Sequence, residues 1–311
     1  MPMQALAADL ARYAVYGLTV ESAFPLGTLP STPGDGQVDV RILRAAPGTF
    51  AGFDVSASET TWYRRAVLAD GNIYLGIPDV LQAIISADGR TARCAPAPEG
   101  DPRSFEANVL NFVLTAALTL QGEEPFHATV VRLDDRAVGF LGDSGTGKST
   151  LASFLLAEGA ELVTDDMLRI VYDADEPIAW RGPPRLKLFD EQARLLLPAA
   201  VRAAAFNPMS GKLLVEAAAP RAARIALSAL FWLDEPPPSD ATVTVRAVQG
   251  VEAIRILLAS TLHRDHRPPD RIERQLRAIE RLAKSVSLFA VAYPRRHELL
   301  PAVADAVRRS R

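Results

Sequence analysis

The first hundred residues alternate apolar and polar positions over short runs, and glycine and proline clusters separate these runs. A period of two places successive side chains on opposite faces of a strand, so each run predicts a β-strand. The predicted strands are Ala14–Glu21, Val38–Leu43, Thr60–Val67 and Asn72–Gly76. Another strand pair is expected around Asp88-Gly89. Residues 1–103 are therefore predicted to form a small antiparallel β domain.

A proline-rich break over residues 94–103 ends this pattern. Apolar residues then recur at helical spacing from Phe105 to Gln121, which predicts a helix with one buried face. Ser104 is its expected N-cap, and Gly122 follows it as a stop.

From Pro125 onward the chain alternates between predicted strands and predicted helices. The strands are His127–Arg132, Ala137–Leu141, Glu161–Val163, Leu168–Tyr172, Ala226–Leu233, Thr242–Val248 and Val286–Ala292. The helices are Lys148–Glu158, Gly250–Leu262, Pro269–Ser285 and His297–Arg309. This alternation is typical of an α/β domain, which we assign to residues 104–311, after the β-rich one.

A glycine-rich loop joins the strand Ala137–Leu141 to the helix that follows it. The loop and the first helical residues are Gly142, Asp143, Ser144, Gly145, Thr146, Gly147, Lys148, Ser149 and Thr150. This is the Walker A pattern, in which backbone N–H groups and the start of the helix surround phosphate oxygens. Lys148 is predicted to reach the β- and γ-phosphates, and the Ser149 hydroxyl to bind Mg²⁺. The alternative is an ordinary turn, but the flanking strand and helix favour a site for ATP or GTP.

Asp165 and Asp166 follow the next predicted strand. The carboxyl ends of neighbouring parallel strands face the same crevice, so both carboxylates are expected near the phosphates. One carboxylate would bind Mg²⁺ and the other would orient the acceptor hydroxyl and take its proton. The residues alone leave open which aspartate does which, and a solvated Asp-Asp turn is the alternative.

These segments resemble the catalytic core of HPr kinase/phosphorylase. The resemblance runs from about Phe126 to Val171 and rests on His127–Val131, the loop and Leu162–Asp166. It implies an α/β fold related to phosphoenolpyruvate carboxykinase. It also implies that Asp165 is the general base, that Asp166 and Ser149 hold the metal, and that His127 lies beside the catalytic aspartate.

The chain departs from the bifunctional enzymes at Ala179-Trp180-Arg181-Gly182, where they carry a Glu-Ile-Arg-Gly type of signature, so the Arg-Gly pair is kept and the glutamate is not. Phosphorylase activity and HPr as the acceptor are therefore not implied. The layout is more similar to the shorter kinases found with lasso-peptide biosynthesis genes, through Tyr13–Leu18 and Pro184–Leu188. Those proteins phosphorylate a serine at the C-terminal end of a precursor peptide. Arg181 is expected to neutralise the transferring phosphoryl group, the alternative being a solvated strand edge.

Composition limits the partners further. The 311 residues carry a net charge of −3, which provides no overall field for nucleic acid or anionic lipid. The one cysteine, Cys94, excludes an internal disulfide and a multi-cysteine zinc site. No signal-peptide pattern or bilayer-length apolar run is found, so we expect a cytoplasmic enzyme.

The sequence thus predicts an ATP- and Mg²⁺-dependent kinase whose acceptor is a serine of a peptide or small protein. Two alternatives stay open: a small-molecule kinase, and a nucleotide-dependent switch with little transferase activity. The family habit of assembling subunits makes a homo-oligomer an expectation, with its size open.

Overall fold

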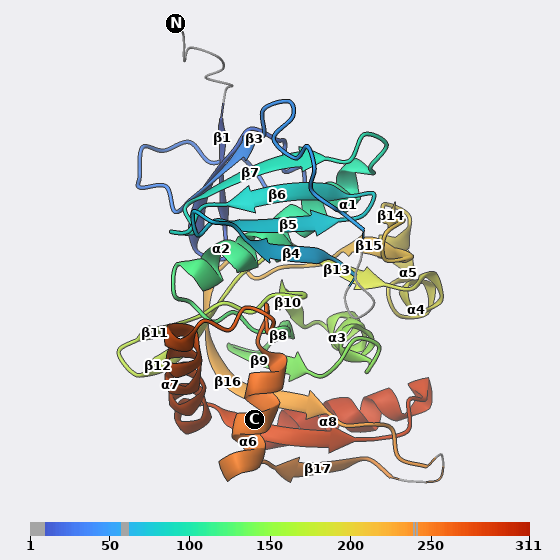
Figure 1. The fold of residues 1–311 in the computed structure, drawn as a ribbon. Coiled ribbons are helices and arrows are strands. Elements are labelled where there is room, and N and C mark those ends of the chain that lie inside the picture. The colour runs from blue at the N-terminus through green and yellow to red at the C-terminus, as the bar shows by residue number, and fades with distance from the viewer. Residues whose placement is uncertain (1–9, 57–61, 239, 241) are drawn as a thin grey trace, which may run out of the picture. The chain divides into compact units, whose positions relative to one another are not determined.

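The computed structural model describes residues 10–56, 62–238, 240 and 242–311. The chain divides into two compact units: Met1–Glu123 with Asn207–Ser210, and Glu124–Phe206 with Gly211–Arg311. The described residues form a mixed α/β structure with three sheets, as the sequence predicts at this level (Figure 1). The helices between Pro102 and Leu120 belong to the first unit, whereas the sequence analysis placed them in the second domain.

The first unit contains a seven-stranded sheet of order β1-β2-β3-β7-β6-β5-β4. Its strands are β1 (Ala11–Val15), β2 (Leu18–Ser22), β3 (Val40–Arg44), β4 (Arg64–Val67), β5 (Ile73–Ile77), β6 (Leu81–Ile85) and β7 (Thr91–Pro96). The prediction of a purely antiparallel sheet is wrong, because β3 pairs in parallel with both β2 and β7. Thr60 and Thr61, the start of one predicted strand, lie outside the described residues.

The single strand predicted over Ala14–Glu21 is a hairpin instead. β1 and β2 pair antiparallel around a two-residue turn in which Tyr16 and Gly17 have φ values of 55° and 72°. Two left-handed residues make the tight turn that joins twisted antiparallel strands. The apolar alternation continues through such a turn, so periodicity alone did not reveal it.

The predicted helix from Phe105 to Gln121 is present as three segments: α1 (Pro102–Asn108), a π-helical turn η1 (Val109–Val113) and α2 (Leu114–Leu120). The predicted N-cap is wrong. Asp101 caps the helix, because its side chain accepts hydrogen bonds from the backbone N–H groups of Arg103 and Ser104. Pro102 then occupies the first helical position, where a missing N–H costs nothing.

The second unit is built on an eight-stranded sheet of order β10-β8-β9-β16-β12-β11, with β18 on β16 and β17 on β18. The strands are β8 (Thr129–Leu133), β9 (Arg136–Leu141), β10 (Glu161–Thr164), β11 (Ile170–Asp173), β12 (Glu176–Trp180), β16 (Arg224–Leu233), β17 (Thr244–Ala247) and β18 (Ser287–Ala292). β9, β16 and β18 are parallel. β10 shares their direction, because β8 pairs antiparallel with both β9 and β10. The carboxyl ends of four strands and the start of β8 therefore meet at one edge.

Helices pack on both faces of this sheet. Side chains of β9 alternate between two apolar cores: Ala137 and Leu141 enter the core formed with α6 (Gly250–Ser260) and α7 (Pro269–Ser285). Val138 and Phe140 enter the core formed with α3 (Lys148–Ala157) and α8 (Leu300–Ser310). A sheet covered on both faces holds its strand ends rigidly, and that rigidity suits the placement of a site at the edge.

A three-stranded sheet of order β13-β15-β14 completes this part of the chain. It comprises β13 (Arg185–Leu188), β14 (Ala205–Asn207) and β15 (Lys212–Glu216), together with α4 (Asp190–Leu196) and α5 (Pro198–Val201). Leu186 and Val215 pack with Leu162 of β10, so β13 lies beside the strand that ends at the aspartate pair. The sequence analysis did not predict these elements.

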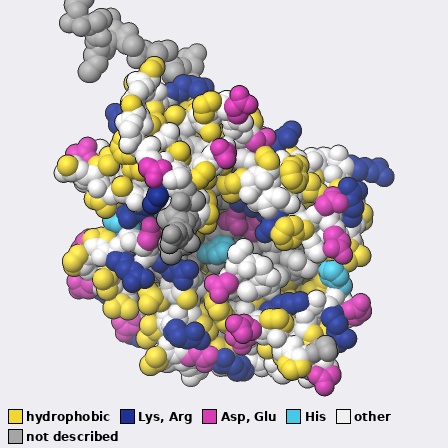
Figure 2. Space-filling view, turned by 45° about the vertical axis from the view of Figure 1, so that its right-hand side comes forward, with side chains coloured by type: hydrophobic (Ala, Val, Ile, Leu, Met, Phe, Trp, Pro, Cys, Tyr) yellow, Lys and Arg dark blue, Asp and Glu magenta, His cyan; other side chains and the backbone are white. Residues whose placement is uncertain are grey.

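Charged side chains of both signs are interspersed over the face drawn in Figure 2. Within the described ranges, no helix has the length and apolar character needed to cross a bilayer.

Glu124 and Arg271 form an ion pair at 2.8 Å whose two side chains are each 2% exposed. Glu124→Gln leaves the guanidinium buried without its counter-charge, and we expect the free energy of unfolding to fall by about 3 kcal/mol. Urea denaturation measures this loss. Glu273→Gln, which breaks the exposed pair with Arg277, is the matched control and should leave the unfolding midpoint unchanged. Equal effects of the two substitutions would contradict the prediction.

Candidate functional site

The loop between β9 and α3 adopts a conformation that requires glycine. Gly142 and Gly147 have φ values of 139° and 97°, which side chains disfavour. A Cβ at Gly142 would also lie 2.7 Å from the Thr146 hydroxyl oxygen. Thr146 closes the loop on itself, because its hydroxyl donates to the Asp143 carbonyl at 2.9 Å. The Walker A glycines are thus explained by the shape of the loop.

Lys148 is held at the mouth of this loop. Its Nζ donates to the carbonyl oxygens of Gly142 and Asp143 at 2.7 and 2.9 Å, and the residue is 7% exposed. Burial lowers the pKa of Lys148, although Asp165 and Asp166 oppose that shift. The ammonium is therefore short of counter-charge and well placed to gain one from phosphate oxygens.

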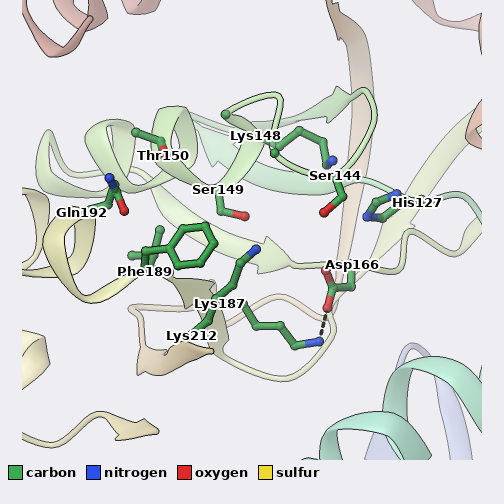
Figure 3. Close-up of a pocket in the computed structure, with 13 residues that line it drawn as sticks. His127, Ser144, Lys148, Ser149, Thr150, Asp166, Lys187, Phe189, Gln192 and Lys212 are labelled. Atoms are coloured by element: carbon green, nitrogen blue, oxygen red, sulfur yellow. Dashed lines mark ion pairs between the residues drawn. The ribbon is translucent and has the colours of Figure 1, made fainter. Parts of the chain in front are cut away.

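A cavity of about 290 Å³ opens beside the loop (Figure 3). Its lining comprises His127, Ser144, Gly145, Gly147, Lys148, Ser149, Thr150, Asp166, Lys187, Leu188, Phe189, Gln192 and Lys212. These residues come from the loop and α3, the end of β10, and β13 with its neighbours. The sheet edge thus brings together Lys148, Ser149, His127 and Asp166. The sequence analysis expected Asp166 there from the strand order and His127 from the family resemblance.

The cavity carries more positive than negative charge. Lys148, Lys187 and Lys212 line it, against one carboxylate, that of Asp166. The Lys212 ammonium also lies over the Phe189 ring, 5.0 Å from its centroid. Three ammonium groups around hydroxyl and backbone donors match a polyphosphate better than an uncharged ligand.

The two aspartates face different surroundings. Asp165 is 6% exposed, and its carboxylate accepts hydrogen bonds from the Thr129 hydroxyl at 2.7 Å and the Lys187 backbone N–H at 3.0 Å. Asp166 has a left-handed φ of 68°, and its Oδ2 lies 2.5 Å from Lys187 Nζ. Asp166 lines the cavity, whereas Asp165 is not among the lining residues. The backbone turn therefore points one carboxylate inward and the other toward the cavity.

The different surroundings of Asp165 and Asp166 shift their pKa values in opposite directions. Burial raises the pKa of Asp165, and the adjacent Asp166 charge raises it further. Burial is the largest influence on Asp166 and disfavours its charged form, but the charge and hydrogen bond of Lys187, together with the other nearby cationic groups, hold the pKa of Asp166 below its usual range. Asp166 is therefore the more firmly ionised member.

His127 lies just before β8, at the sheet edge where β9 and β10 end. Burial, reinforced by the nearby Lys148 charge, lowers the pKa of His127 to about 4. The imidazole is therefore neutral at pH 7 and adds no positive charge to the cavity.

This shift predicts a pH effect on stability. Below pH 6.5 His127 is protonated in the unfolded chain, whereas in the folded protein it stays neutral down to about pH 4. Stability therefore decreases as the pH is lowered through this window. The loss amounts to about 2 kcal/mol between pH 7 and pH 5. His127→Asn removes this pH-dependent loss, because asparagine does not titrate. The unfolding free energies of wild type and variant should therefore converge or cross as the pH falls. The contribution of Asp165 to the pH dependence is common to both proteins. A constant difference in urea denaturation would refute the shift.

Arg181 does not reach the cavity. Its guanidinium donates to the Pro220 carbonyl at 2.6 Å, and its backbone N–H donates to the Ala223 carbonyl. The residue follows the end of β12 and joins that segment to the start of β16. The predicted catalytic role of Arg181 has no support in this geometry, because both contacts serve the chain itself.

Five lining residues were absent from the predicted site: Lys187, Leu188, Phe189, Gln192 and Lys212. Lys187 and Leu188 entered the sequence analysis only as part of the segment Pro184–Leu188. The five residues lie on β13, at the start of α4 and within it, and on β15, and these elements carry no motif. Only the position of Lys187 shortly after the Asp pair was a signal.

The residues present fit Mg²⁺. The Ser149 hydroxyl and the Asp166 carboxylate line one cavity, and both are hard oxygen ligands. The described part of the chain holds no cluster of three or more His, Cys, Asp or Glu arranged for a metal. A two-ligand protein site that relies on phosphate oxygens and water is the arrangement typical of Mg²⁺.

No protein-family model matches the chain. No curated protein matches it either. Among solved structures, the chain is similar to the HPr(Ser) kinase/phosphatase from Coxiella burnetii, with 14% identity and a TM-score of 0.33. That match covers 60% of this chain and 94% of the other.

Proposed function

We propose that this protein is an ATP- and Mg²⁺-dependent kinase that transfers the γ-phosphoryl group to a hydroxyl. The observation that carries the proposal is the cavity in which Lys148, Ser149 and Asp166 converge with Lys187 and Lys212. The order of strand, phosphate loop, helix and Asp-ended strand, with β8 antiparallel beside β9, supports a phosphoenolpyruvate-carboxykinase-like P-loop domain.

The chain's own groups have distinct tasks. The loop N–H groups and Lys148 bind the phosphates, and Ser149 and Asp166 would hold Mg²⁺. When bound, that ion would neutralise charge that develops on the transferring group. Lys187 and Lys212 add positive charge on the opposite wall. Positioning and charge stabilisation together account for most catalysis in phosphoryl transfer.

The aspartate assignment follows the geometry and departs from the family resemblance. We assign the carboxylate that meets the metal and the acceptor to Asp166, because it lines the cavity. Asp165 holds the Thr129 hydroxyl and the Lys187 backbone in place. It is a positioning residue in this proposal and does not act as the general base.

For the acceptor we propose a serine hydroxyl of a peptide or small protein. The finer proposal is the C-terminal serine of a lasso precursor peptide, and it rests on the resemblance at Tyr13–Leu18 and Pro184–Leu188. The second of these segments supplies Lys187 and Leu188 to the cavity wall.

The test is incubation with γ-labelled ATP, Mg²⁺ and peptides that end in serine, beside peptides that end in alanine. Label should move to the serine peptides with wild-type protein and not with Lys148→Ala. Label on a metabolite alone would replace the peptide acceptor with a small molecule. ATP binding without any transfer would overturn the kinase proposal in favour of a nucleotide switch.

A further inference from the structure

A second cavity, of about 170 Å³, lies beside the phosphate loop. It shares Gly145, Gly147, Thr150 and Gln192 with the first cavity, so the two are neighbours along the loop and the start of α3. Its remaining wall is the segment after β18, from Tyr293 to His297, with Leu300 of α8. Neither the Walker A motif nor the aspartate pair explains this cavity.

The sheet topology explains why the segment after β18 lies beside the loop that follows β9. β9, β16 and β18 are parallel neighbours, so the loop after β9 and the segment after β18 leave the sheet at the same edge. Arg295 ties the two together: its Nε donates to the Thr146 carbonyl at 2.8 Å, and its guanidinium lies 4.1 Å from the centroid of the Tyr293 ring. The cavity thus has a wall that is fixed to the phosphate loop.

The direction of a bound nucleotide follows from the first cavity. In Figure 3, Asp166 and His127 lie at one end, Thr150 and Gln192 at the other, and Ser149 between them. The γ-phosphate belongs at the end that holds Asp166, since transfer requires the metal and the acceptor there. The other end of the nucleotide therefore points toward Thr150 and Gln192, the two side chains that both cavities share.

The chemistry of the second cavity differs from that of the first. Arg295 donates from Nε, from NH1 to the Tyr293 carbonyl and from NH2 to the Asp234 carbonyl, so its guanidinium is engaged in structure. Arg296 is exposed and His297 is partly exposed, and both line the cavity beside the apolar Leu300. A planar guanidinium and an imidazole next to an aliphatic surface suit a flat heteroaromatic ring that also offers hydrogen-bonding edges.

We propose that the nucleoside of the bound triphosphate occupies this second cavity and that Arg296 and His297 bind its base. The inference rests on the proposed function, because it takes the triphosphate in the first cavity as given. It adds the nucleoside subsite and the residues that distinguish a nucleoside triphosphate from a bare polyphosphate.

The test compares ATP with inorganic tripolyphosphate, which has the same phosphates and no nucleoside. Calorimetric titration with Mg²⁺ is run on wild type, on the double variant Arg296→Ala/His297→Ala, and on Arg308→Ala as a control for an exposed arginine of α8. The double variant should weaken ATP binding by about tenfold, as expected for one exposed and one partly exposed contact with the base. Tripolyphosphate binding should stay unchanged, and the control should match wild type for both ligands.

Two results would overturn the subsite. One is unchanged ATP affinity in the double variant, and the other is an equal loss for ATP and tripolyphosphate, which would make these residues phosphate contacts. Lys148→Ala tests the phosphate site separately from the nucleoside subsite, because it should weaken the binding of both ATP and tripolyphosphate. If wild type binds neither ligand, the proposed function itself fails. If it binds both and the double variant is normal, only the nucleoside subsite fails.

Discussion

Asp166→Asn lowers the rate of phosphoryl transfer by about a thousandfold, while the protein stays folded with a modest loss of stability from the broken ion pair with Lys187. The substitution removes the negative charge from the cavity but keeps the shape of the side chain. Asparagine also tolerates the left-handed backbone at this position, where φ is 68°. The loss therefore reports the charge that would hold Mg²⁺, and not a distorted turn. Single-turnover transfer from labelled ATP measures the rate, and thermal denaturation checks the fold.

Asp165→Asn is the matched control, because it makes the same chemical change one residue earlier. Its carboxylate accepts two hydrogen bonds inside the protein, and an amide has only one oxygen to accept them. We expect a stability loss of about 1–3 kcal/mol and a transfer rate within about tenfold of wild type. The opposite pattern, a rate collapse at full stability for Asp165→Asn alone, would return the general-base role to Asp165.

Lys148→Ala should lower kcat/KM for ATP by at least about a thousandfold. The ammonium already lies at the loop mouth, bonded to two carbonyl oxygens, so little rearrangement is needed for it to reach phosphate oxygens. Without the Lys148 side chain, the loop N–H groups bind the β- and γ-phosphates with no ammonium group from the loop beside them.

Lys284→Ala is the control for loss of a lysine, because Lys284 forms an exposed helical ion pair with Glu280 far along α7. It should leave kcat/KM unchanged. Steady-state rates over a range of ATP concentrations separate the two variants. A Lys148→Ala protein that binds ATP and turns over normally would remove this cavity as the nucleotide site.

The phosphate loop could be predicted from the sequence because its chemistry and its backbone geometry need the same residues. Gly142 and Gly147 are required by positive φ values, and Lys148 and Ser149 by the proposed phosphate binding, so one short motif carries both. The convergence of Asp166 on the loop also followed from the sequence, since the carboxyl ends of neighbouring parallel strands meet at one sheet edge. The position of His127 was expected only from the family resemblance.

The other wall of the cavity could not be predicted in this way. Lys187, Phe189 and Lys212 reach the cavity through pairing of β13 with β15 and packing of Leu186 on Leu162, which are contacts between distant segments. The sequence around Arg181 looked equally basic, but its guanidinium bonds the Pro220 carbonyl. Charge and proximity along the chain did not distinguish a side chain that faces the cavity from one that braces a loop.

The roles of the two aspartates show the same limit. The sequence places Asp165 and Asp166 together, but it does not fix which one turns left-handed. In the structure the Thr164 hydroxyl donates to the Met167 carbonyl, and the Met167 N–H donates to the Asp165 carbonyl. This tight turn sends Asp166 toward the cavity, a result that depends on three-dimensional contacts at the end of β10.

The most direct measurement is an equilibrium titration of wild-type protein with ATP, in the presence and absence of Mg²⁺. Saturable one-to-one binding that tightens with Mg²⁺, and that is lost in Lys148→Ala and no longer tightened by Mg²⁺ in Asp166→Asn, is the result the cavity predicts. Binding that is absent, or that is indifferent to both Mg²⁺ and Lys148, would contradict the assignment of this cavity as a Mg²⁺–nucleotide site.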